Sequence, residues 1–155
     1  MTYLLVKWLH ILSSTLLFGT GLGSAFYMYL ASRTRDARVI ASVARHVVIA
    51  DWVFTTPTVI LQPATGFWLV HLAGYPLSTP WILWSLGLYL LAGAAWLPVV
   101  WMQIRMRDMA AAAVRDGVEL PDVYWRLLRA WTVLGVIAFL AVIIIFYLMI
   151  VKPLN

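Results

Sequence analysis

The sequence contains no cysteine, which excludes disulfides, thiolate metal sites, c-type haem attachment and a cysteine nucleophile. Charge is also scarce, since 11% of the 155 residues are charged and 64% are hydrophobic. Soluble domains carry about 25% charged residues, so this chain has too little polar surface to cover a soluble monomer. Motifs of soluble enzymes are missing as well: the sequence has no P-loop, dinucleotide fingerprint, nucleophile elbow or HExxH. The composition predicts a single domain, residues 1–155, whose solvent is the lipid bilayer.

Four apolar stretches are long enough to cross the hydrocarbon core of a bilayer, which takes about 20 residues. They lie at approximately residues 3–31, 47–72, 81–104 and 130–151. We therefore expect an all-α membrane protein, built as a four-transmembrane-helix bundle in contact with membrane lipid.

The basic residues are distributed unevenly between the two ends of these spans. Lys7 and Lys152 lie at one end, whereas every arginine lies in or beside the connections that follow the first and third spans. Because Lys and Arg collect in cytoplasmic loops, we expect an N-out/C-out protein of the bacterial inner membrane, with both termini on the periplasmic side. The net charge of +5 then reflects topology, and we expect no nucleic-acid partner. The arginines are Arg33, Arg35, Arg38, Arg45, Arg105, Arg107, Arg115, Arg126 and Arg129.

One polar stretch, RDMAAAAVRDGVELPD at residues 107–122, separates the third and fourth spans. Its alanines favour a helix, and Gly117 and Pro121 are residues that end helices. We expect a short amphipathic helix lying on the cytoplasmic surface in this connection.

One face of the first span is unusually small and polar. Two interpretations are open: close packing between helices, or a recess that admits a ligand. Residues on this face recur at spacings of four and three, and they are His10, Ser14, Leu17, Gly21, Ser24 and Met28.

The second span carries a polar stripe and two prolines. Pro57 and Pro63 each remove a backbone donor and leave carbonyls free. Such a span can line a cavity, or it can hold the bundle together through hydrogen bonds. The residues expected to be buried and polar in this stripe are Asp51, Thr55, Thr58, Gln62 and Thr65.

Asp51 is the acidic residue within the predicted spans, about one turn inside the cytoplasmic boundary. An unpaired carboxylate is costly in lipid, so we expect a structural ion pair with an arginine at the same depth. A proton-relay acid is the alternative. The arginines at that depth are Arg45, Arg105, Arg126 and Arg129.

The histidines fall at both ends of the bundle. His10 and His71 are expected near the outer face and can share a site, whereas His46 begins the second span on the cytoplasmic side. Nine residues separate Gln62 from His71, which puts them about half a turn out of phase on an ideal helix. Only a distorted helix would turn His71 towards the polar stripe.

Three segments resemble a known family. The runs KWLHILSSTLLFGTGLGSAF, ADWVFTTPTVILQPATGFWLVHLAGYPLSTPW and WLPVVWMQIRMRD look like a bacterial family of small predicted integral membrane proteins of unknown function. The resemblance covers nearly the whole chain and implies a four-helix inner-membrane protein.

The opening KWLHILSS is also similar to the first helix of HemJ-type protoporphyrinogen oxidases and of CopD-type copper-resistance membrane proteins. In the HemJ-type family this histidine ligates a b-type haem, so the resemblance implies that His10 is a metal ligand. His71 is then the candidate second ligand, and Ser14 and Gly21 are candidates for lining the haem slot. The third span has no lysine where the HemJ-type family has one, so the resemblance implies haem binding more than porphyrinogen oxidation.

Three functions follow from these observations. The first is a b-type haem protein that serves electron transfer or a membrane oxidoreductase role. The second is a non-catalytic accessory or assembly subunit of a membrane complex, whose partners are other membrane subunits or copies of itself. The third is a small transporter subunit, which the proline-broken second span favours and which would have to form a homo-oligomer.

Overall fold

The computed structural model describes residues 1–153, and all regular structure in them is helical. A single π-helical turn, η1, joins α2 and α3 without a break, so these three elements form one rod. The four resulting rods are each long and apolar enough to cross a membrane, which confirms the predicted fold class. The elements are α1 (Thr2–Arg33), α2 (Ala37–Ala50), η1 (Asp51–Thr55), α3 (Thr56–Leu72), α4 (Pro80–Asp116) and α5 (Asp122–Val151).

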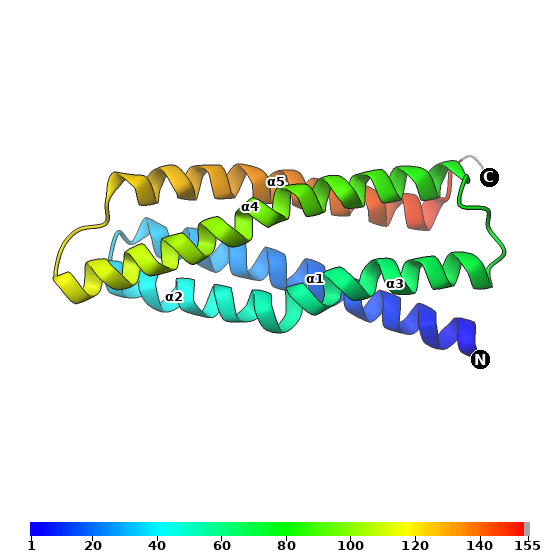
Figure 1. Ribbon diagram of the computed structural model, residues 1–155, viewed down its shortest axis with the longest axis horizontal. Helices are drawn as coiled ribbons and strands as arrows, with labels where there is room; N and C mark the ends of the chain where they lie inside the picture. Colours follow the sequence, from blue (N-terminus) through cyan, green and yellow to red (C-terminus); the bar gives the residue numbers. More distant parts are fainter. Residues whose placement is uncertain (154–155) are drawn as a thin grey trace.

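The rods lie side by side in an elongated bundle, and the start of α1 lies at the same end as the end of α5 (Figure 1). We call this end the terminal end, and the end with the connections 34–36 and 117–121 the arginine end. The helix α1 packs along α2 and α3, α2 packs along α4, and α4 packs along α5. Which end faces the cytoplasm remains the sequence-based prediction.

The densest packing lies towards the arginine end, where α1, α2, α4 and α5 meet. The Tyr124, Met28, Ile40 and Met106 side chains are fully enclosed there. The Tyr124 hydroxyl also donates to Ser32 Oγ at 2.8 Å, which ties α5 to α1. This cluster comprises Met28, Ala31, Ile40, Ala44, Val47, Val99, Met106, Ala110, Tyr124 and Trp131.

Three helices extend beyond the predicted apolar stretches at this end. Residues 107–116 continue α4 and do not form a separate surface helix, although Gly117 ends the helix as expected, with φ 65°. The second rod begins at Ala37, before the apolar stretch from residue 47, and α5 begins at Asp122, before the stretch from residue 130. All three extensions bury an apolar face in the packed cluster, including Ala110, Ile40 and Tyr124. Protein packing therefore keeps these segments helical beyond the apolar stretch that lipid requires.

The π-helical turn η1 has a local cause in Pro57. In a regular α-helix the ring of this proline would clash with the carbonyl of residue 53. One widened turn, in which the Thr56 N–H donates to the Asp51 carbonyl, accommodates it. The turn leaves Asp51 and Thr55 both buried inside the bundle.

Candidate functional site

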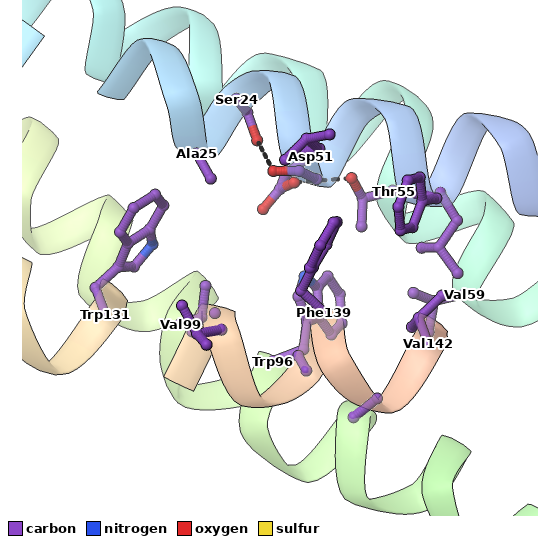
Figure 2. Close-up of a pocket in the computed structure, with 18 of the residues that line it drawn as sticks. Ser24, Ala25, Asp51, Thr55, Val59, Trp96, Val99, Trp131, Phe139 and Val142 are labelled. Carbon is purple, nitrogen blue, oxygen red and sulfur yellow. Dashed lines mark hydrogen bonds between the residues drawn. The ribbon is translucent and has the colours of Figure 1, made fainter. Parts of the chain in front are cut away.

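Two cavities lie along the bundle between the α1–α3 side and the α4–α5 side. The central cavity has a volume of about 430 Å³, and its lining includes Gly21, Asp51, Tyr89, Trp96, Gln103 and Phe139 (Figure 2). The terminal cavity has a volume of about 420 Å³, and its lining includes Lys7, His10, Gly66, Tyr89, Met149 and Lys152. Both volumes fall in the range of small-molecule sites, about 300–1,000 Å³. Tyr89 belongs to the walls of both cavities.

His10 is held in one orientation by α3. Its Nδ1 atom lies 2.8 Å from Thr65 Oγ1, and the Thr65 hydroxyl has the Leu61 carbonyl as its acceptor at 2.7 Å. Because the Thr65 hydroxyl can direct its single proton to Leu61, Thr65 Oγ1 can accept from His10 Nδ1–H. In this tautomer, which a metal ligand at Nε2 requires, the lone pair of the ring lies on Nε2.

The Nε2 atom of His10 is open to the terminal cavity. It has no hydrogen-bond partner among the described residues. Every buried side-chain nitrogen or oxygen in residues 1–153 does have a partner, so Nε2 is not a buried atom. Nε2 is therefore accessible, and His10 lines this cavity. Gly66 provides the space for the ring, because a Cβ atom at Gly66 would lie 3.4 Å from His10 Cε1.

The lysines of the chain both line the terminal cavity. The Lys152 Nζ atom lies 5.3 Å from the centroid of the Tyr75 ring, and the Lys7 Nζ atom lies 6.0 Å from that of Tyr3. In residues 1–153 the ion pairs are Arg107–Asp108 and Arg115–Asp116, so neither lysine has a carboxylate partner in that range. The cavity thus combines a largely apolar lining with two positive charges.

The Asp51 carboxyl group lies at the wall of the central cavity and faces the hollow in Figure 2. The Thr55 hydroxyl donates to Oδ1 at 2.8 Å, and Gln103 Nε2 donates to Oδ2. Trp131 Nε1 in turn donates to Gln103 Oε1 at 3.4 Å. Asp51 is 6% exposed and Gln103 2%, so the network is buried and joins η1, α4 and α5.

The expected ion pair of Asp51 with an arginine is wrong for the described part of the chain. No arginine in residues 1–153 lies within 4 Å of that carboxyl group. Asp51 is buried inside the bundle, whereas Arg45, Arg105, Arg126 and Arg129 are exposed. The carboxyl group is satisfied by a hydroxyl and an amide instead.

The other residues of the polar stripe have both roles that the sequence left open: they line cavities, and they form hydrogen bonds that hold the bundle together. Gln62 accepts from the Ser13 hydroxyl across the α1–α3 contact, and it also lines the terminal cavity. Thr58 bonds within its own helix, donating to the Phe54 carbonyl at 2.7 Å. Thr55 lines the central cavity beside Asp51. The stripe therefore holds the bundle together and lines both cavities.

The wall between the cavities depends on Pro63. Since proline has no N–H, the Val59 carbonyl has no helical donor. The Tyr89 hydroxyl donates to this carbonyl from α4 and so links α3 to α4. Both cavities thus end at the Tyr89 side chain, which donates to the carbonyl that Pro63 leaves without a helical donor.

Sequence comparison now assigns the family. A family described as predicted integral membrane proteins, DUF2269, matches residues 4–153. The chain belongs to this family. No curated protein and no solved structure matches it significantly. The DUF2269 match covers all four spans and confirms the family resemblance that the three sequence segments carry.

Within this DUF2269 chain, the four predicted cofactor-binding residues do not gather. His10 lines the terminal cavity and Gly21 the central one. His71 is exposed near the end of α3, and the Ser14 hydroxyl donates to the Ile11 carbonyl at 2.7 Å without lining either cavity. His71 is thus outside both cavity linings.

Tyr89, Met149 and Lys152 line the terminal cavity but were not assigned to a site from the sequence. Met149 and Lys152 come from the end of the fourth span and lie across the cavity from residues of α1 and α3. The four-span topology contained a signal for both, because it brings the two ends of the chain to the same end of the bundle. It gave no indication of which face of α5 points inward.

Proposed function

We propose that this integral membrane protein binds a b-type haem through His10 in the terminal cavity. It then serves electron transfer or a membrane oxidoreductase role in the bacterial inner membrane. The observation that carries the proposal is the orientation of His10: Nδ1 is bonded to Thr65 and Nε2 is accessible from an apolar cavity. Metal-ligating histidines characteristically bond their second nitrogen to a fixed acceptor, which sets the tautomer and the ring orientation.

The residues of the terminal cavity fit this cofactor in three respects. His10 would hold the iron through its Nε2 atom. The apolar lining suits the flat macrocycle, and Lys7 and Lys152 suit the two propionate groups. When bound, the haem would supply one-electron chemistry, and the protein would set its potential through the axial ligands and the polarity of the cavity.

The second protein ligand is proposed to differ from the one expected from the sequence. His71 is exposed and outside the cavity lining, so it is a poor candidate. Met149 lines the same cavity as His10, and a methionine thioether would be a suitable second ligand for haem iron beside a histidine. Ligation by His10 alone is the other outcome.

The test is a visible spectrum of the purified protein in mild detergent, first oxidised and then reduced with dithionite. We expect a Soret band and sharp bands in the reduced protein, lost in His10→Ala. His71→Ala is the matched control and should leave the spectrum unchanged, because His71 lies outside the cavity lining. Met149→Leu should change the bands of the reduced protein if the thioether is the second ligand.

A second variant separates loss of the ligand from loss of the fold. Gly66→Leu places a side chain where a Cβ atom alone already lies 3.4 Å from His10 Cε1. We expect weaker haem binding in a protein that still elutes as a single species. A preparation made with ample haem supply that shows no Soret band would contradict the proposal. The accessory or assembly subunit of a membrane complex would then be the preferred function.

A further inference from the structure

The central cavity offers one carboxyl group in an apolar, partly aromatic enclosure. Trp96 and Phe139 lie opposite Asp51 across the hollow in Figure 2. Gly93 on α4 and Gly135 on α5 both border open space, because a Cβ atom at either position would meet nothing within 4 Å. These glycines therefore contribute to the cavity and not to a close contact between two helices.

The exposed residues of the lining show where this cavity opens. Leu22 and Tyr29 on α1 are 48% and 47% exposed, and Val136 on α5 is 50% exposed. All three lie within apolar stretches that face lipid in a bilayer. A ligand therefore enters sideways from the membrane between α1 and α5, and it must itself be soluble in lipid.

The chemistry of Asp51 narrows the class of ligand. Each carboxylate oxygen has two lone pairs, and the protein uses one on each oxygen, through Thr55 and Gln103. An ionised Asp51 can thus accept a further hydrogen bond from a ligand hydroxyl. A protonated Asp51 can donate one to a ligand carbonyl.

From these observations we infer that the central cavity binds a quinol or quinone, with an oxygen of its ring directed at Asp51. The two redox forms of this class present the hydroxyl and the carbonyl that match the two protonation states of the carboxyl group. Their ring matches the aromatic wall, where offset or edge-to-face contacts with Trp96 and Phe139 are favourable. A lipid acyl chain would fill the same walls but would offer Asp51 no partner.

The site is separate from the proposed haem site and does not depend on it. Tyr89 lies in the wall of both cavities, so a ligand in each would be separated there by one side chain. Loss of haem through His10→Ala should leave quinol binding in the central cavity intact. The two proposals can therefore fail independently.

The test measures binding of a short-chain ubiquinol and ubiquinone to the protein in lipid nanodiscs through quenching of tryptophan fluorescence. Trp96 and Trp131 line the cavity and report occupancy. We expect a saturable component above the linear quenching caused by ligand dissolved in the lipid. Gly93→Leu, which fills the cavity, should weaken this component at least about tenfold, equivalent to about 1.4 kcal/mol.

The matched control is Gly87→Leu, the same change on the same helix at an exposed position outside both cavities. It should bind as the unaltered protein does. Asp51→Leu should also weaken binding about tenfold, the loss expected for one hydrogen bond to a carboxyl group. If Gly93→Leu fails to fold, Gly135→Leu fills the same cavity from α5.

Two results would overturn the inference. The first is the absence of any saturable component. The second is saturable binding that the cavity-filling variants or Asp51→Leu leave unchanged, which would mean that the quinol binds elsewhere or that the cavity is a plain apolar slot for acyl chains.

Discussion

Gln103→Leu tests the physical account of the Asp51 network. The change keeps the approximate size of the side chain but removes the amide that donates to Asp51 Oδ2. It also removes the acceptor of Trp131 Nε1, although that contact is long at 3.4 Å and contributes little. Asp51 is then left with the single donor Thr55, at a position that is 6% exposed.

The expected cost follows from this burial. Hydrogen bonds between helices in membrane proteins contribute about 0.6 kcal/mol on average. A buried acceptor that loses its partner costs about 1–3 kcal/mol. The second figure applies to Asp51, because the carboxyl group faces a mostly apolar cavity that opens toward lipid, which offers no donor to replace the amide. We therefore expect Gln103→Leu to lower the free energy of unfolding by about 2 kcal/mol.

The assay is equilibrium unfolding in mixed micelles with increasing denaturing detergent, followed by tryptophan fluorescence and circular dichroism. Thr58→Val is the matched control, since Thr58 is equally buried but bonds only within its own helix, and it should cost less than about 0.5 kcal/mol. The double variant Asp51→Leu/Gln103→Leu removes both partners and should be more stable than Gln103→Leu alone.

A Gln103→Leu protein as stable as the control would refute this reasoning. So would a double variant in which the two losses simply add. Either result would mean that the bond between Gln103 and Asp51 does not stabilise the bundle.

Two further predictions concern links between helices. Tyr89→Phe leaves the Val59 carbonyl without a donor and should lower the free energy of unfolding by about 1 kcal/mol, measured in the same detergent titration. In a Pro63→Ala background, where the helix regains an N–H for that carbonyl, the same change should cost almost nothing; equal losses in both backgrounds would contradict the account. Ser32→Ala should destabilise more than Tyr124→Phe, because the first strands a fully buried phenol hydroxyl, whereas Ser32 keeps the Met28 carbonyl as its acceptor in the second. The reverse order in thermal unfolding would show that the phenol finds another partner.

The number of spans and the direction of each span were predictable from the sequence, because crossing a bilayer determines both. Four stretches of sufficient length predict four crossings, and an even number of crossings returns the chain to the end where it began. The helix ends were less predictable, since α2, α4 and α5 extend beyond their apolar stretches along faces buried in the packed cluster. Lipid sets the minimum length of a span, and contacts with other helices set its actual length.

The candidate site was predictable only residue by residue. His10 was singled out by its position in the first span, and Asp51 by its polarity within the second. Their partners Thr65 and Gln103 lie 55 and 52 residues away along the chain. Nothing in the local pattern connects residues so far apart. The expected arginine partner of Asp51 was wrong because depth in the membrane says nothing about the direction of a side chain.

By itself, then, the sequence determined that the protein lies in a lipid bilayer, that it has four spans, and that the first and last spans place their outer ends on the same side. All three follow from the count and length of the apolar stretches. Only the tertiary structure decided which polar groups meet and where the helices leave space. The regular spacing of the polar stripe already placed Asp51 on the inner side of the second span. Its partner Gln103 lies on α4, and only the packing of the helices brings these two side chains together.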